Sequence, residues 1–294
     1  MENETSIRVN EVDGLTPRAL SDGLSVGELE RALLAAMPAH DACTWDRTGM
    51  LVGDPSSEVR GVAIALDPTI AALEQAYRSG CNVLVTHHPV FLDAPESFLP
   101  ALNQGHTPGA VVRHAIQHDI SIISFHTALD VSVAGLGVLP ALLRLEQVGV
   151  LDPLAHDASK GFGAVCAVPS DQGTLTLNLL AARCTSVFGS IPRVWGNPET
   201  PLHRVVTSGG SAGSFAQACI QSGVQCLVCG EMKYHEALDA SLSGLAIIEL
   251  GHDVSEAPLC AVLASYVVAA GVPESRITMT DGNTHWFTPE AIRK

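Results

Sequence analysis

The chain has 294 residues, of which 47% are hydrophobic, so one large domain or two modest domains can bury a sizeable core. Aromatic residues make up only 4%, and a core of aliphatic side chains is typical of parallel sheets covered by helices. The formal net charge of −15 argues against a nucleic-acid partner, which would need clustered lysine and arginine, and against binding to an anionic membrane surface.

The cysteines and the N-terminal residues indicate in which cellular compartment the protein is expected. The eight cysteines show no disulfide framework, and a strand would turn the two thiols of Cys226-Leu227-Val228-Cys229 to opposite faces, which disfavours a redox or zinc role. Residues 1–24 are polar and carry no apolar signal region, and no window reaches about 18 uninterrupted apolar residues. We therefore expect a cytoplasmic protein without a membrane span and with a loosely ordered N-terminal extension.

The first third of the chain alternates helix and strand signals. Ser25-Val26-Gly27-Glu28 has capping-box spacing and predicts the start of a helix. The pattern then predicts strands and helices in alternation, with strands at 59–66, 81–86 and 120–125 and helices at 68–79 and 108–118. This β-α-β-α-β order predicts a mostly parallel, doubly wound sheet.

The rest of the chain predicts a second lobe of the same kind. Residues 60–80 can be laid over residues 203–223 without a gap, and the later strand and site positions follow in step. We interpret this as an internal duplication, with a first α/β lobe at 25–135 and a second at 136–294, whose C-terminal segment is a candidate to pack back on the first lobe. Further expected elements are helices at 135–145, 175–184 and 259–270, strands at 163–168 and 276–279, and an exposed loop around 191–201.

A glycine- and serine-rich stretch, residues 208–214, falls between a predicted strand and a predicted helix. Backbone N–H groups in such a loop can cradle a phosphate, although the stretch lacks the Lys-Ser/Thr ending of a P-loop. A plain turn between strand and helix is the favoured interpretation, and a phosphate site is the alternative.

Three predicted strands end in residues that can bind metals. Val83-Leu84-Val85-Thr86 is followed by His87 and His88, and Pro89 ends the strand because it has no N–H to donate. The two other apolar runs end in a histidine with an acid four residues later, which gives the pairs His126 with Asp130 and His252 with Glu256. Open α/β sheets bind ligands at the carboxyl ends of their strands, so we expect these side chains to converge.

Four imidazoles and two carboxylates are more than one tetrahedral ion needs. They suit two divalent ions per subunit, with Asp130 and Glu256 as candidate bridging ligands between them. Any one of these histidines alone would be better explained as an ordinary core or surface residue, but three strand ends with the same chemistry favour metal. The mixed imidazole and carboxylate ligands suit Zn, Mn, Fe or Co and do not choose among them.

The three motifs T-H-H-P, H-T-A-L-D and G-H-D-V-S-E, in this order, resemble those of the dinuclear metal-centre hexameric proteins, the Nif-three-like family called GTP cyclohydrolase 1 type 2 homologues. Residues 45–53 and 229–235 extend the resemblance, with Cys229 where the family more often has threonine. The resemblance implies metal binding at the H-H, H-x-x-x-D and H-x-x-x-E positions, and it implies a homohexamer. For His126 the alternative is a position that contacts the ligands and not the metal. The chain is too short for the middle domain of longer members.

Two divalent ions that activate a bridging water predict a hydrolase. Glu231 and His235 are candidate catalytic residues that move protons, and Lys233 is a candidate to hold a substrate anion; a solvated helix start explains the three equally well. The resemblance suggests a nucleotide or related phosphorylated substrate, with opening of the GTP imidazole ring as one reaction. The alternative is a non-catalytic protein that binds or handles metal, or regulates a partner.

Overall fold

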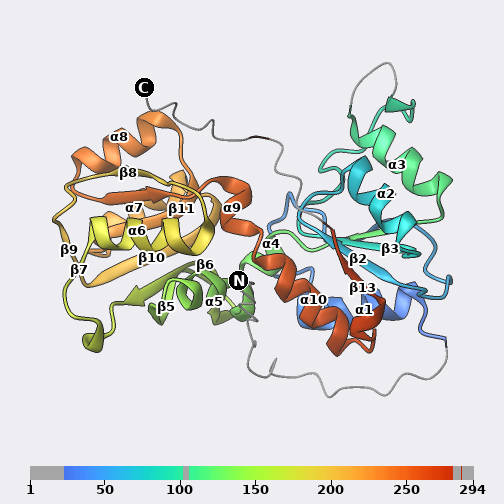
Figure 1. Cartoon of the computed structure of the whole chain (residues 1–294), viewed down its shortest axis with the longest axis horizontal. Helices are drawn as coiled ribbons and strands as arrows, with labels where there is room; N and C mark the ends of the chain where they lie inside the picture. The colour runs from blue at the N-terminus through green and yellow to red at the C-terminus, as the bar shows by residue number, and fades with distance from the viewer. Residues whose placement is uncertain (1–22, 102–105, 281–285, 287–294) are drawn as a thin grey trace, which may run out of the picture.

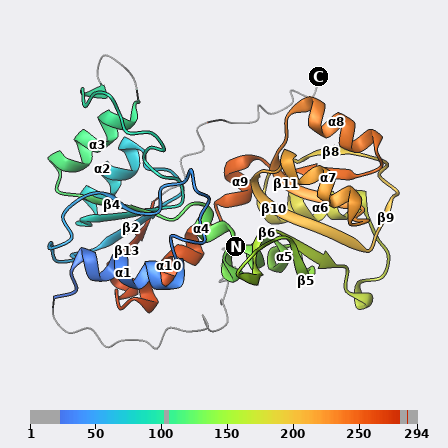
Figure 2. The same cartoon turned by 180° about the vertical axis from the view of Figure 1, so that it is seen from behind.

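The computed structural model describes residues 23–101, 106–280 and 286, so the predicted N-terminal extension lies almost wholly outside the described residues. Two α/β lobes lie side by side (Figure 1). Seen from behind, the short helices α4 (Thr127–Asp130) and α9 (His252–Glu256) lie where the lobes meet (Figure 2). The predicted α/β class is confirmed. Among the described residues, no helix is long and apolar enough to span a membrane.

The first lobe is built on a five-stranded sheet. Its order is β1 (Gly49–Val52), β4 (Ser121–Ser124), β3 (Val83–Thr86), β2 (Val62–Ala65) and β13 (Ile277–Met279). All neighbouring pairs are parallel except β1 with β4. Every residue of β2, β3 and β4 is buried, which explains their continuous apolar runs.

Capping residues fix the first-lobe helices close to their predicted positions. Helix α1 (Val26–Ala36) begins with the predicted capping box, in which the Ser25 hydroxyl accepts from the Glu28 N–H and the Glu28 carboxylate accepts from the Ser25 N–H. At the start of α2 (Ile70–Arg78) and of α3 (Pro108–Gln117), a threonine hydroxyl accepts a hydrogen bond from one backbone N–H of the first turn.

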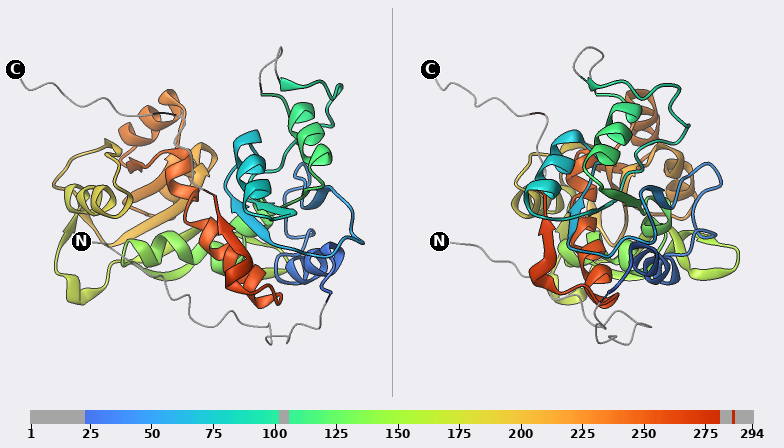
Figure 3. Two further views of the ribbon diagram at one scale, coloured as in Figure 1. Left: turned by 45° about the vertical axis from the view of Figure 1, so that its right-hand side comes forward. Right: turned by 90° about the vertical axis from the view of Figure 1, so that its right-hand side faces the viewer.

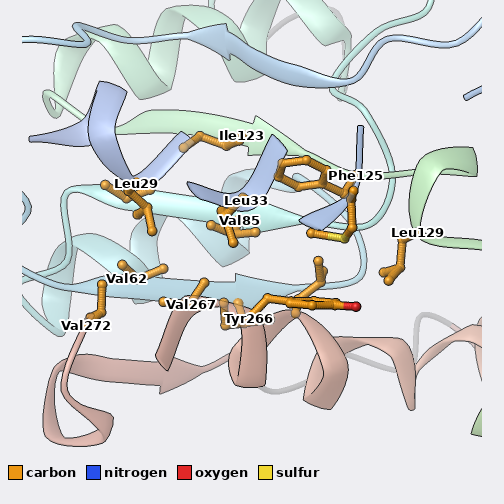
Figure 4. Packing of buried hydrophobic residues seen from close by; sticks show 14 of the residues in the cluster. Leu29, Leu33, Val62, Val85, Ile123, Phe125, Leu129, Tyr266, Val267 and Val272 are labelled. Carbon is orange, nitrogen blue, oxygen red and sulfur yellow. The ribbon is translucent and has the colours of Figure 1, made fainter. Parts of the chain in front are cut away.

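The core of the first lobe includes residues from the far end of the chain. Helix α10 (Leu259–Ala269) packs with α1 on one face of the sheet, and Tyr266 and Val267 meet Leu33 and Val85 there (Figure 4). Helices α2 and α3 cover the other face. After α10 the chain returns to this sheet, because β13 pairs in parallel with β2 (Figure 3). The C-terminal segment therefore closes the first lobe.

The second lobe is built on a six-stranded sheet. Its order is β5 (Glu146–Leu154), β6 (Asp157–Ala167), β10 (Arg204–Ser211), β11 (Cys226–Glu231), β12 (Ala246–Glu249) and β8 (Arg193–Trp195), and a separate pair joins β7 (Leu175–Thr176) to β9 (Pro201–Leu202). Only β10, β11 and β12 run parallel; the other pairings are antiparallel. The prediction of mostly parallel sheets therefore holds for the first lobe and is wrong for the second, where the β5–β6 hairpin and β8 add antiparallel strands on both sides.

The segment 191–201 is largely exposed, as predicted, but it is not all loop, since it contains the edge strand β8. The strand is held by Glu249 of β12, which accepts two hydrogen bonds of 2.6 Å from the Arg193 guanidinium and one of 2.7 Å from Trp195 Nε1. Glu249 is buried and also accepts from the Met232 N–H at 3.0 Å. Glu249 is 56 residues from Arg193 and 54 residues from Trp195 in the sequence. The residues around β8 therefore give little indication of a strand.

Helices cover both faces of the second sheet. Helices α5 (Val133–Leu142) and α6 (Leu177–Phe188) pack on one face, and α7 (Ala216–Gln221) and α8 (Tyr234–Leu242) on the other. Cys226 and Cys229 belong to the cores on opposite faces, as expected for a strand. Short 3₁₀ turns complete the described elements at Ser170–Gln172, Gly213–Phe215 and Glu274–Arg276.

The two lobes share one order of elements. The series β2, α2, β3, α3, β4, α4 corresponds to β10, α7, β11, α8, β12, α9. In each lobe the three strands are parallel neighbours in the same order, and a short helix follows the third strand. This order is compatible with an internal duplication, which stays a prediction.

Candidate metal centre

The six predicted ligands converge between the lobes. His87 and His88 follow β3, His126 and Asp130 cap and end α4, and the other pair occupies the two ends of α9. Their ligand atoms form three overlapping groups in which all atoms lie within 4.8 Å of one another: His87 with His88 and His126, His88 with His252 and Glu256, and His87 with Asp130 and Glu256. Three strand ends that are far apart in the sequence thus supply one cluster.

Glu256 lies at the centre of this cluster. Its Oε2 is 3.0 Å from His88 Nε2, 3.1 Å from His252 Nε2 and 3.7 Å from His87 Nε2. The residue is only 3% exposed. Burial opposes the charge of Glu256, but the hydrogen bonds from His252 and His88 and the nearby His87 ring outweigh it and hold its pKa far below the usual range.

His87 shows most directly that a cation fits here. Its Nδ1 lies 3.1 Å from the Phe125 carbonyl oxygen and must donate to it, so that in the neutral imidazole Nε2 carries a lone pair. Among the described residues this buried Nε2 has no hydrogen-bond partner, yet it is 3.6 Å from Asp130 Oδ1 and 3.7 Å from Glu256 Oε2. A lone pair facing two carboxylates is the arrangement that a divalent cation satisfies.

The other three imidazoles are oriented in the same way by carboxylates. Nδ1 lies 2.7 Å from Asp67 in His88, 3.1 Å from Asp46 in His126 and 3.0 Å from Glu231 in His252. Such hydrogen bonds fix the ring and leave Nε2 as the ligand atom. Asp67 has no counterpart in the sequence motifs. The signal for it was its place just after the strand β2, beside the strand that carries the two histidines.

The carboxylates of the cluster stabilise positive charge on the imidazoles next to them. Burial lowers the pKa of His88, but hydrogen bonds with Asp67 and Glu256 outweigh it and raise the pKa to about 10. The Glu256 hydrogen bond is also the main reason why the pKa of His252 rises to about 9. Burial, with a contribution from the Glu256 carboxylate, raises the pKa of Asp130. Protons and divalent ions therefore compete for the same positions.

A cavity of about 520 Å³ opens beside the cluster. Four of the predicted ligands line it, together with residues from both lobes. The cavity is also lined by Trp45, Leu136, Leu139, Asp152, Phe162, residues 207–211, Ser214 and Phe215. A small molecule in this cavity would reach the metal ligands directly.

Residues 208–211 of the glycine-rich stretch belong to strand β10, and only residues 212–214 lie in the turn between β10 and α7. Gly210 has φ of +60°, and a Cβ at this position would overlap Glu256 Oε1. Its N–H donates to the Ser255 hydroxyl of α9 at 3.0 Å. The glycines therefore let β10 approach α9 closely, and this approach places Glu256 against the histidines.

Of the residues predicted to move protons or hold a substrate, only one contacts a predicted metal ligand. Glu231 is exposed at the end of β11, and its Oε1 accepts the hydrogen bond that orients His252. His235 is exposed on α8, where its described contact is with the neighbouring Tyr234 ring. Lys233 is also exposed and lies 3.7 Å from Glu236. Glu231 therefore contacts a predicted ligand, whereas none of Glu231, Lys233 and His235 belongs to the described lining of the cavity.

The fold and the cluster define an α/β protein with side chains that can bind metal ions. The family model described as Duf34/NIF3 (NGG1p interacting factor 3) matches residues 24–283, and the chain belongs to this family. The chain is similar to the "GTP cyclohydrolase 1 type 2 homolog" of Streptomyces coelicolor, with 32% identity over 80% of this chain and 82% of that protein. The protein of the same name from Clostridium acetobutylicum is 26% identical over 77% and 83%.

Solved structures show the same fold. A hypothetical protein of Staphylococcus aureus superposes with a TM-score of 0.80 at 25% identity, over 92% of this chain and all of that one. A Bacillus cereus protein related to NIF3 gives a TM-score of 0.80 at 20% identity with the same coverage. The family resemblance found in the motifs is thus confirmed.

Proposed function

We propose that the protein is a metal-dependent hydrolase that binds two divalent ions per subunit and acts on a nucleotide or related phosphorylated metabolite. The observation that carries the proposal is the buried His87 Nε2, which faces two carboxylates beside a cavity. His87, His88, His126, Asp130, His252 and Glu256 would hold the ions. When bound, the ions would lower the pKa of a bridging water so that it can act as hydroxide near neutral pH.

The side chains around the ions would hold ligands and move protons. Asp67, Asp46 and Glu231 fix the imidazoles, so that the ligand geometry is set before metal binds. Glu231 is exposed beside His252, and we propose it as the group that takes a proton from the reacting water. His235 stays a second candidate, which would have to move toward the substrate to act.

The most specific reaction that we propose is opening of the GTP imidazole ring with release of formate. The support for this reaction is the name of the relatives, "GTP cyclohydrolase 1 type 2 homolog". A name shared along with a fold does not itself establish a reaction. The test measures formate released from GTP by protein reconstituted with Zn, Mn, Fe or Co. Asp130→Ala removes a ligand, and Asp239→Ala is the matched control on the exposed surface of α8.

Turnover that requires metal and is lost in Asp130→Ala but kept in Asp239→Ala would support the hydrolase and its substrate together. Two tightly bound ions without turnover would rule out GTP and favour the alternative of a non-catalytic metal-binding or regulatory protein. A metal content that Asp130→Ala leaves unchanged would contradict the ligand assignment itself.

We also propose that the protein is a cytoplasmic homohexamer. Its support is the family resemblance. Light scattering coupled to gel filtration tests the assembly. A mass well below six chains at micromolar concentration would contradict it.

A further inference from the structure

The cavity beside the metal cluster has an unusual charge for a nucleotide site. Its described lining contains three acids, Asp130, Asp152 and Glu256, and two histidines, His126 and His252, of which His252 is paired with Glu256; among these described residues there is no lysine or arginine. Phosphate chains are normally held by such cations or by metal ions. The whole chain carries a formal charge of −15, which adds to the repulsion of a polyanion. The lining by itself therefore selects against a phosphate chain.

The same cavity has an aromatic and aliphatic wall. The rings of Phe162 and Phe215 stack with centroids 5.8 Å apart and an angle of 26°, and both line the cavity. Leu136 and Leu139 of α5 add an apolar surface. Trp45 stands half-exposed, with its ring 5.7 Å from the His126 ring. Flat apolar surfaces of this kind bind planar rings by stacking and by exclusion of water.

Polar groups border the wall on the side of β10. The antiparallel pairing of β10 with β6 ends at Thr207, so residues 208–211 have no β6 partner and line the cavity. Ser214 and Asp152 line the same cavity, so residues with backbone, hydroxyl and carboxylate groups border it. Such acceptors and donors match the edge of a heteroaromatic ring, which carries N–H and carbonyl groups in its plane.

We infer that the cavity binds an uncharged planar heteroaromatic ring, such as a nucleobase, and that only bound metal ions would hold a phosphate group. The inference rests on the proposed function, because it takes this cavity to be the substrate site. Phe162 and Phe215 are then specificity-determining residues that stack on the ring. The neutral part of a nucleotide binds without metal, whereas its phosphate chain adds no affinity until metal is present.

The test uses calorimetric titration of the full chain, loaded with metal and after chelation, with guanosine, GTP and inorganic tripolyphosphate as probes. We expect the metal-free protein to bind guanosine at least as tightly as GTP and not to bind tripolyphosphate. Phe162→Ala should weaken guanosine binding about tenfold, which is the loss expected for one stacking contact between a base and an aromatic side chain. Phe98→Ala, at an exposed position outside the cavity lining, is the matched control and should bind normally.

Binding of tripolyphosphate to the metal-free protein would overturn the inference. So would guanosine affinity that is unchanged in Phe162→Ala, reduced equally in Phe98→Ala, or undetectable in both metal states. Phe162 is only partly buried, and thermal unfolding of each variant separates loss of stacking from loss of the fold. Failure to release formate while guanosine binding still depends on Phe162 would contradict the GTP reaction but not the ring site.

Discussion

At the scale of residues, the site depends on contacts that orient the ligands as much as on the ligands. Asp67 and Asp46 each hold one imidazole by its Nδ1. Burial raises the pKa of Asp46, but hydrogen bonds from His126 and Thr127 outweigh this and lower it to about 2, so this carboxylate stays charged at any physiological pH. The strand-end histidines could be picked out in the sequence because of their spacing. Asp67 has no such spacing, and its only signal was its place just after β2, which lies beside β3.

Gly210 gives a prediction about the close approach of β10 to α9. In Gly210→Ala the added Cβ would overlap Glu256 Oε1, so the carboxylate must leave the position where it meets His88 and His252. We expect the variant to lose at least half of its bound metal, measured by elemental analysis after dialysis.

Gly223→Ala is the matched control for this effect. Gly223 has a similar φ of +66°, but nothing lies within 4 Å of its would-be Cβ. This variant should lose about 1–2 kcal/mol of folding free energy from backbone strain and keep its full metal content. Equal metal loss in both variants would mean that strain, and not the contact with Glu256, causes the effect.

At the scale of elements, the helix and strand order was largely predictable because amphipathic helices and buried strands are local patterns. Helix α1 follows from its capping box and β3 from its apolar run. The edge strand β8 was missed because its stability comes from Glu249, which lies on another strand. Strand β5 was missed and β6 was predicted only in part, although the two form a local hairpin. The antiparallel pairing of β6 with β10, which joins this hairpin to the sheet, is a long-range contact.

The contact between β8 and β12 predicts a specific dependence of stability on pH. Burial raises the pKa of Glu249, but hydrogen bonds from Arg193, Trp195 and the Met232 N–H outweigh this, so its pKa in the folded state lies below the ordinary 4.5. A lowered pKa stabilises the fold above pH of about 4.5, and this contribution is lost as the pH falls through the folded-state value.

Glu249→Gln tests this prediction. It should cost about 1.5–3 kcal/mol at pH 7, the usual contribution of hydrogen bonds to a charged group. Urea unfolding at pH 7 and at several values below pH 4.5 should show that the difference from the wild type shrinks in acid. A difference that stays constant down to the lowest pH at which both proteins fold would contradict the assignment.

At the scale of the whole molecule, the candidate metal ligands come from both lobes. His87, His88, His126 and Asp130 come from the first lobe, and His252 and Glu256 follow a strand of the second. A second contact between the lobes is formed by the buried Asp41, which accepts from Lys160 at 2.7 Å and from His156 at 2.7 Å. Bound metal should therefore stabilise the relative position of the lobes as well as each ligand.

We predict that metal raises the stability of the whole chain. An ion that binds only the folded state contributes about 2.7 kcal/mol at a free concentration of 100 times its Kd. Thermal unfolding should show a Tm that rises with metal and falls on chelation, and Glu256→Gln should abolish the response. A metal response that survives in Glu256→Gln would place the bound ion elsewhere.

The sequence alone determined the α/β class, most helix positions and the six strand-end side chains, because periodicity, caps and strand ends are encoded within a few neighbouring residues. Only the tertiary structure decided the mixed strand directions, the return of α10 and β13 to the first lobe, and the meeting of Glu256 with three histidines. These features depend on pairing and packing between segments up to 216 residues apart, as in the Thr280 contact with Ile64. Such contacts are selected by the free energy of the whole fold, which no local pattern expresses.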